Sequence, residues 1–213
     1  MIKIINSSQS QALDELSVGR GKKLDRLIEN AGKVLSTHII ENIPDPFRKT
    51  FLCVAGIGNN GLDTIVCNHF LIKNNIKSTL LIINHNKINS RYLDQYTSYI
   101  NYIGLEELED IDSYDYVVDG IFGTGLSRDI DDIYLESINK IKGHRNIISV
   151  DIPSGIYTDS GKTANIHIEA RETISFTYPK IAHFLGEGYS STGKLYLYPI
   201  GHSKLALKNI KTQ

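Results

Sequence analysis

Short apolar runs alternate with amphipathic segments along the whole chain, and Gly, Pro and Asn residues separate them. Four runs are rich in β-branched residues and read as buried parallel strands: 50–55, 78–83, 114–120 and 146–151. Two later strands are predicted near 173–177 and 194–198. Helices are predicted between them, at 62–74, 90–103 and 131–142. This alternation is typical of a doubly wound α/β sandwich.

Two helices are predicted before the first strand. Apolar positions from Leu24 to Ile39 follow helical spacing, and Ser7 or Ser8 is predicted to cap a shorter helix that carries Leu13 and Leu16. The chain shows neither internal repeats nor a low-complexity linker, so we expect one domain over residues 1–213.

Composition narrows the function classes. The chain has 213 residues and a formal net charge of -1, so no global basic field attracts nucleic acid or an anionic membrane, and small-molecule partners are favoured. Cys53 and Cys67 are too far apart for a CxxC motif and are predicted to be core thiols in a reducing compartment. With no signal-peptide pattern and no long apolar span, we expect a soluble cytoplasmic protein.

The first strand leads into GIGNNG at 56–61, which has the GxGxxG spacing of dinucleotide-binding loops. A standard NAD site also places an acid at the end of the second strand, but the sequence there is IINHN, which argues against an ordinary dehydrogenase. Asn59 and Asn60 suggest that side-chain amides take part in binding. A simple Asn-Gly turn is the alternative.

The third strand ends in VVDGIFGTGLSRD, residues 117–129. Its three glycines allow backbone N–H groups to approach an anion, although a glycine-rich loop without a ligand and with a solvated Arg128 would look the same. Asp119 is more informative, because a carboxylate at the end of a buried strand needs a cation or several donors. It could instead cap the following turn.

The fourth strand ends in VDIPSG, which places Asp151 and Ser154 at the same edge of the predicted sheet. With Asp119 and Asn60 they form an all-oxygen group, although an Asx-type turn would also explain Asp151. Few carboxylates and several neutral oxygens favour a weakly charged hard cation over zinc, which prefers His and Cys.

Five segments together resemble the YjeF N-terminal family, the NAD(P)HX epimerases, over nearly the whole chain: IENAG at 28–32, GIGNNGLD at 56–63, VVDGIFGTGL at 117–126, DIPSG at 151–155 and TISFTYPK at 173–180. The resemblance implies a Rossmann-like three-layer α/β/α sandwich with a mostly parallel central sheet and N-terminal helices. It implies an isomerase that interconverts the R and S epimers of C6-hydrated NADH or NADPH.

The resemblance also implies a bound potassium ion, with Asn60, Asp119 and Ser154 as ligands. The implied substrate-binding residues are Asn59, Asn60, Gly61, Leu62, Asp63, Gly123, Thr124, Gly125, Leu126, Ser127, Arg128, Asp129 and Asp151. Further implied partners are a separate dehydratase that acts on the product and a second copy of the chain in a homodimer.

One departure from the family pattern concerns the first loop. The family usually reads GNNGGDG, whereas this chain reads GNNGLDT, so Leu62 and Thr64 replace two glycines. If either position required a positive φ or close approach of the substrate, its β-carbon would interfere. Asn59, Asn60 and Asp63 persist, so a working enzyme is expected.

Asp151 is the predicted acid/base, on the hypothesis that partial desolvation tunes its pKa toward neutrality. Lys180 is predicted to orient that carboxylate or to bind a phosphate; a solvated lysine is the alternative. His38 is predicted to be structural, and Glu29 either faces the site or is an exposed helical acid. A ligand-binding or dimerisation module that has lost the reaction remains open, favoured by the altered loop, as does, more weakly, an NAD-dependent oxidoreductase.

Overall fold

The computed structural model describes residues 3–19, 21, 23–88, 90–98 and 102–210. Its centre is a seven-stranded sheet in the order β3-β2-β1-β4-β5-β6-β7, in which every neighbouring pair is parallel. The strands are β1 (Thr50–Ala55), β2 (Lys77–Ile82), β3 (Tyr102–Ile103), β4 (Tyr116–Gly120), β5 (Ile147–Val150), β6 (Glu172–Phe176) and β7 (Lys194–Tyr198). All six predicted strands are confirmed.

The predicted helix at 90–103 is too long. Helix α4 (Ser90–Thr97) ends early, residues 99–101 lie outside the described part of the chain, and Tyr102–Ile103 forms the short edge strand β3. Two residues pair with β2 there, a segment too short to show strand periodicity in the sequence.

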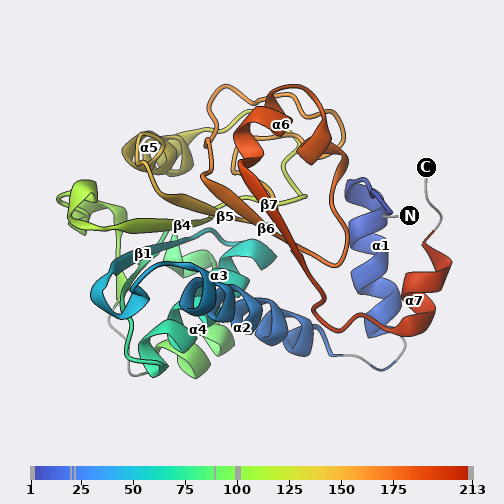
Figure 1. The fold of residues 1–213 in the computed structure, drawn as a ribbon, viewed down its shortest axis with the longest axis horizontal. Coiled ribbons are helices and arrows are strands. Elements are labelled where there is room, and N and C mark those ends of the chain that lie inside the picture. The colour runs from blue at the N-terminus through green and yellow to red at the C-terminus, as the bar shows by residue number, and fades with distance from the viewer. Residues whose placement is uncertain (1–2, 20, 22, 89, 99–101, 211–213) are drawn as a thin grey trace.

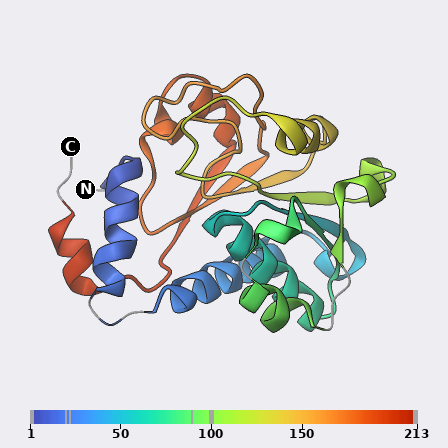
Figure 2. The same cartoon turned by 180° about the vertical axis from the view of Figure 1, so that it is seen from behind.

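Helices cover both faces of the sheet (Figure 1), which confirms the three-layer α/β/α sandwich. Helices α2 (Leu24–Asn42), α3 (Asn59–Lys73) and α4 lie on one side, and α5 (Asp132–Ile141) and α6 (Gly186–Thr192) on the other. Seen from behind, the sheet again separates the two layers (Figure 2). Within β1, Phe51 and Cys53 pack into one apolar cluster while Leu52 and Val54 pack into the other. Burial on both faces explains the continuous apolar run of this strand.

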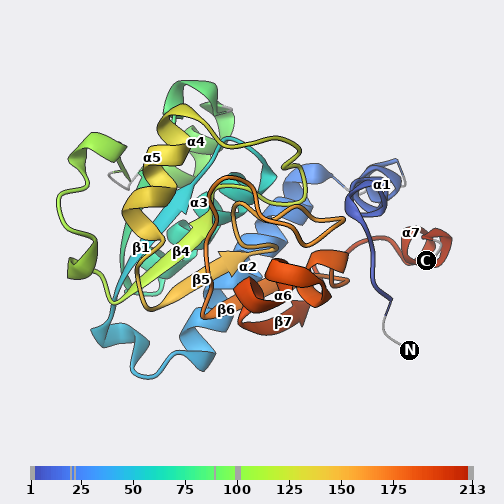
Figure 3. The same cartoon turned by 90° about the horizontal axis from the view of Figure 1, so that it is seen from above.

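Helix α1 (Ser7–Val18) lies away from the two layers, beside α7 (Lys204–Asn209) (Figure 3). A small apolar cluster, which includes Leu13 and Ala206, joins them. Asn6 caps α1 through a capping box with Gln9, so the predicted cap at Ser7 or Ser8 is wrong, and the cap lies one residue before Ser7. The two ends of the described chain therefore meet at one end of the sheet.

Helix α2, the longest described helix at 19 residues, buries the stripe that starts at Leu27 and ends at Ile39. Among the described residues, no helix combines the length and apolar character needed to cross a membrane. Gly32 is the close-approach point of α2 on α3, because a β-carbon there would lie 2.5 Å from Cβ of Val66 and 2.8 Å from the backbone nitrogen of Cys67. The glycine of the IENAG segment thus sets the spacing of this helix layer.

We expect Gly32→Ala to lower the free energy of unfolding by about 1–3 kcal/mol, because the added methyl forces α2 away from α3. Urea unfolding followed by circular dichroism measures the change. Gly143→Ala is the matched control, since a β-carbon there meets no atom within 4 Å. Equal stability of the two variants would show that the α2–α3 spacing is not set by Gly32.

Candidate active site

An open cleft of about 820 Å³ lies where the carboxyl ends of the central strands meet α1. Its walls are the start of α1, the turn into α3, the loop after β4 and the segment after DIPSG. The lining includes Ser7, Ser8, Gln11, Asp14, Gly58, Asn59, Asn60, Phe122, Gly123, Thr124, Gly125, Leu126, Ser127, Tyr157, Thr158 and Asp159. We call this the outer cleft. Parallel strands gather their loops at this edge, where α/β proteins bind ligands.

A second cavity of about 80 Å³ adjoins it, and we call it the inner cavity. Asp14, Asn59, Asn60 and Thr124 border both spaces. The ionisable residues that line the inner cavity are Asp14, Asp63, Asp151, Lys180 and His202, and Phe176 and Ile200 supply apolar surface. A small charged chamber thus opens beside a cleft of ligand size.

Asp119, Ser154 and Asn60 belong to one hydrogen-bonded network. The fully buried Asp119 carboxylate accepts bonds from Ser154 Oγ (2.5 Å), Ser154 N (2.9 Å) and Ser149 Oγ (2.8 Å). Ser154 Oγ in turn accepts a bond from the Phe122 backbone N–H (2.9 Å). Asn60 Nδ2 donates to the carbonyl oxygens of Phe122 (3.0 Å) and Val150 (2.7 Å). The structure brings the three predicted ion ligands together; that they hold an ion stays a prediction.

The chemistry of this network suits a monovalent cation. Burial raises the pKa of Asp119 and its hydrogen bonds work to lower it. No cationic side chain in the described part of the chain pairs with this carboxylate. The Asp119 carboxylate, the Ser154 hydroxyl and the amide oxygen of Asn60 make an all-oxygen set. Among the described residues, no three His, Cys, Asp or Glu side chains cluster as a metal site.

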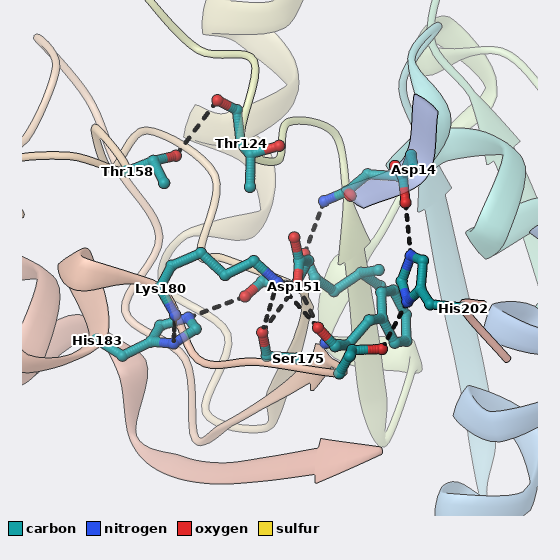
Figure 4. A network of polar contacts seen from close by, with 12 residues as sticks. Asp14, Thr124, Asp151, Thr158, Ser175, Lys180, His183 and His202 are labelled. Atoms are coloured by element: carbon teal, nitrogen blue, oxygen red, sulfur yellow. Dashed lines mark hydrogen bonds and ion pairs between the residues drawn. The ribbon is translucent and has the colours of Figure 1, made fainter. Parts of the chain in front are cut away.

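Asp151 lies at the sharp turn that ends β5, with a left-handed φ of 63°. Lys180 Nζ makes a short ion pair with Asp151 Oδ1, which also accepts bonds from Ser175 Oγ (2.8 Å) and the Phe176 N–H (3.2 Å). Both charged side chains are buried, with Lys180 1% exposed. The alternative of a solvated Lys180 is therefore wrong, and the lysine orients the carboxylate (Figure 4).

Asp151 is held as an anion. Burial acts to raise its pKa, but the Lys180 charge and the hydrogen bonds of Lys180 and Ser175 outweigh it and set the pKa below its ordinary value. The hypothesis of a pKa tuned toward neutrality fails here, because a buried cation accompanies the desolvation. At neutral pH this carboxylate can accept a proton.

His183 is a neutral imidazole that hydrogen-bonds to the backbone of both Lys180 and Asp151. Its Nδ1 accepts a bond from the Lys180 N–H (3.1 Å), so Nε2 carries the proton and donates to the Asp151 carbonyl (2.9 Å). Burial, and secondarily the Lys180 charge, lower the pKa of His183 to about 4. Figure 4 shows this side chain beneath Lys180.

Leu62 and Thr64 do not obstruct the site. Both lie in α3, and neither is among the residues with positive φ. Leu62 is 8% exposed and packs into the apolar cluster beneath the sheet. Thr64 Oγ1 donates to the Asn60 carbonyl (2.8 Å). Position 61, in contrast, needs glycine, because a β-carbon there would lie 1.8 Å from the Gly56 carbonyl oxygen.

Several predicted contacts lie away from the two spaces. Gly61, Leu62, Arg128 and Asp129 are absent from both linings; Asp129 instead accepts a bond from Tyr157 OH (3.2 Å). The remaining predicted substrate residues line one space or both.

Two helical residues take structural roles. Glu29 is partly buried on α2, where it pairs with Lys33 and Arg26, and it lines neither space. His38 is 1% exposed and bonds Tyr198 OH (2.8 Å) and Glu172 (3.2 Å), which confirms a structural role.

Sequence reasoning missed the contribution of the chain ends. Asp14 of α1 bonds His202 Nε2 (2.7 Å), and His202 Nδ1 bonds Thr177 Oγ1 (2.8 Å). Ser7 of α1 donates through N and Oγ to the Asp159 carboxylate (2.6 and 2.7 Å). No pattern in the sequence of α1 predicts that this helix lies beside the site. Ser175 had a detectable signal, because polar residues alternate within the TISFT run.

Comparison with known proteins places the chain among related sequences. A family model described as "YjeF-related protein N-terminus" matches residues 24–182. "NAD(P)H-hydrate epimerase" of Lentilactobacillus buchneri is 28% identical over 94% of this chain and 95% of its own length. "Bifunctional NAD(P)H-hydrate repair enzyme Nnr" of Thermofilum pendens is 29% identical over 98% of this chain, which spans only 42% of that relative.

The fold has a solved counterpart. The crystal structure of the yeast protein ynu0, YNL200c, superposes with a TM-score of 0.75 at 19% identity, and covers 93% of this chain and 88% of its own. At this identity the likeness concerns the architecture.

We expect acid to destabilise the protein through His183. The unfolded chain binds a proton on this residue near pH 6.5 and the folded chain near pH 4, so stability falls as the pH drops through that window, by on the order of 3 kcal/mol. His183→Asn keeps an acceptor for the Lys180 N–H and should flatten this dependence. Urea unfolding at about pH 5 and about pH 7 measures it. The exposed His85→Asn is the control, and equal pH dependence in both variants would contradict the assignment.

Proposed function

The chain belongs to the YjeF-related protein N-terminus family, and we propose that it is an isomerase that interconverts the R and S epimers of C6-hydrated NADH and NADPH, a metabolite-repair reaction. Relatives that match nearly their whole length to this chain carry the name NAD(P)H-hydrate epimerase. The observation that carries the proposal is the buried Asp151 carboxylate, fixed by Lys180 in a small cavity beside a cleft of dinucleotide size.

The two spaces suggest how the substrate binds. The outer cleft offers backbone N–H groups of the 123–127 loop and the start of α3, both suited to pyrophosphate. The inner cavity accepts the hydrated ring beside Asp151. Asn59, Asn60 and Thr124 border both spaces and suit the junction between these parts of the substrate.

Epimerisation requires that the hydroxyl at C6 leave and that oxygen return from the other face of the ring. The hydroxyl takes up a proton and leaves as water while the ring nitrogen's electron pair forms the C=N bond of an iminium, and a water then adds to C6 from the other face. The Asp151 carboxylate takes the proton of that water, which replaces the proton used on the leaving hydroxyl; its ionised state and its fixed position allow this role. Lys180 orients Asp151 and stays bound to it, since its three donors are already used on Asp151, Ser175 and Phe176.

We further propose potassium as the ion of the Asn60, Asp119 and Ser154 network. These three residues would hold it, and it would supply a positive charge that holds the loops after β4 and β5 in place. A monovalent ion polarises water weakly, so it has no part in making a nucleophile.

We also propose the next enzyme, the cellular compartment and the oligomeric state. Bifunctional relatives carry the repair-enzyme name over a longer chain, which supports a dehydratase as the next enzyme. Two free buried cysteines suit the cytoplasm. A homodimer is proposed from the family resemblance. Of the alternatives, the inactive binding module loses its main support, since Leu62 packs away from both spaces.

We expect the purified chain to convert the R epimer of hydrated NADH to an equilibrium mixture with the S epimer, measured by chromatography. Asp151→Asn should lower kcat at least about 100-fold with a small change in KM, because the amide tolerates the left-handed turn but accepts no proton. Asp115→Asn, outside both linings and bonded to Lys49 and Thr50, is the control. Full activity in Asp151→Asn would remove this residue from the chemistry.

We expect potassium chloride to raise the melting temperature more than sodium or lithium chloride at equal ionic strength. Ser154→Ala removes one oxygen of the network and should abolish the difference between the salts, whereas Ser190→Ala, on the exposed side of α6, should retain it. Differential scanning calorimetry measures both. Identical melting of the wild-type protein in all three salts would exclude a potassium site.

A further inference from the structure

Asp63 is a buried carboxyl without a partner. It lies on α3, is 6% exposed and lines the inner cavity. In the described part of the chain its carboxyl oxygens form neither a hydrogen bond nor an ion pair. A buried carboxylate in such a place is costly, so the neutral acid is favoured.

The surroundings of Asp63 also favour its neutral form. Burial raises its pKa well above the ordinary value, the Asp151 and Asp14 charges raise it further, and the Lys180 charge opposes them. Two further ionisable residues lie nearby. His202 lines the same cavity, and Cys67 follows Asp63 by one turn of α3. The cavity therefore holds the neutral Asp63 near the ionised Asp151, an arrangement that separates acid and base roles.

The other ionisable groups of the inner cavity have no free proton to give. Lys180 uses its three donors on Asp151, Ser175 and Phe176. His202 is bonded through both ring nitrogens, to Asp14 and Thr177. Asp151 is ionised, and Asp14 is paired with His202. Among the described residues that line this cavity, Asp63 is the one ionisable group left with an unengaged proton.

We propose that Asp63 is a second catalytic residue, the general acid that protonates the C6 hydroxyl of the hydrated ring while Asp151 acts as the base. This inference rests on the proposed function. Asp63 gives its proton to the hydroxyl, the C–O bond breaks, water departs and the ring nitrogen's electron pair forms the C=N bond. Water then adds to C6 from the other face and gives its proton to Asp151. The proton returns from Asp151 to Asp63 through water in the shared cavity, so the enzyme is unchanged after one turnover.

The test compares Asp63→Asn with the wild-type chain. The amide fits the same space and stays neutral but has no acidic proton, so kcat should fall at least about 100-fold while the Kd for the S epimer, from calorimetric titration, changes by less than about threefold. The decline of kcat/KM at high pH, which reports loss of the acid's proton, should be absent from the residual activity. Asp63→Glu restores an acid and should recover more than about tenfold of the lost kcat.

Asp115→Asn is the matched control, because Asp115 lies at the opposite edge of the sheet, where it bonds Lys49 and Thr50. Its kcat should equal that of the wild type, and melting curves of all variants establish that they fold. An active wild-type chain with Asp63→Asn within about fivefold of it would overturn the acid role and leave the proposed function standing. An inactive wild-type chain would reject the proposed function itself, and the role of Asp63 with it.

Discussion

Two buried charged groups, the Asp119 carboxylate and the Asp151–Lys180 ion pair, constrain the rest of the structure. Each removes charge from water, which costs several kcal/mol unless partners compensate. Asp119 is compensated by donors from Ser149, Ser154 and the backbone, and Asp151 by Lys180, Ser175 and the Phe176 N–H. These partners come from separate strand ends, so the loops after β4, β5 and β6 must keep one arrangement.

The same constraint makes Asp151 and Asp63, two of the three carboxyls that line the inner cavity, differ in protonation state. Asp151 has a cation against it and is ionised, whereas Asp63 has no partner in the described chain and faces two other carboxylates. A shared cavity with unequal neighbours is a general way to obtain an acid and a base from identical side chains. The neutral His183 beneath Lys180 adds a hydrogen bond to the Asp151 backbone without adding charge.

The altered loop of this chain illustrates how a departure from a family pattern is absorbed. Leu62 and Thr64 replace glycines, but α3 begins at Asn59, so both positions have helical backbone, and neither residue lines the outer cleft or the inner cavity. Gly61 remains because the Gly56 carbonyl lies against it. Within this loop, a side chain is excluded only where another part of the backbone approaches closely. The number of glycines does not decide it.

The sequence by itself determined the order of strands and helices, because burial on both faces of a parallel sheet leaves continuous apolar runs that are visible in one dimension. It also indicated that Asp119, Asp151 and Ser154 lie at one sheet edge, since parallel strands end together. It did not reveal strand β3, whose two residues are too few for a pattern, or the Asn6 cap.

Only the tertiary structure decided which carboxyl groups of the site are ionised or neutral. It alone also showed that α1 contributes residues to the site. The pKa of Asp151 depends on Lys180, 29 positions away, and Asp14 reaches His202 across 188 positions. Desolvation and charge pairing act through space over a few ångströms, and separation along the chain carries no record of that distance.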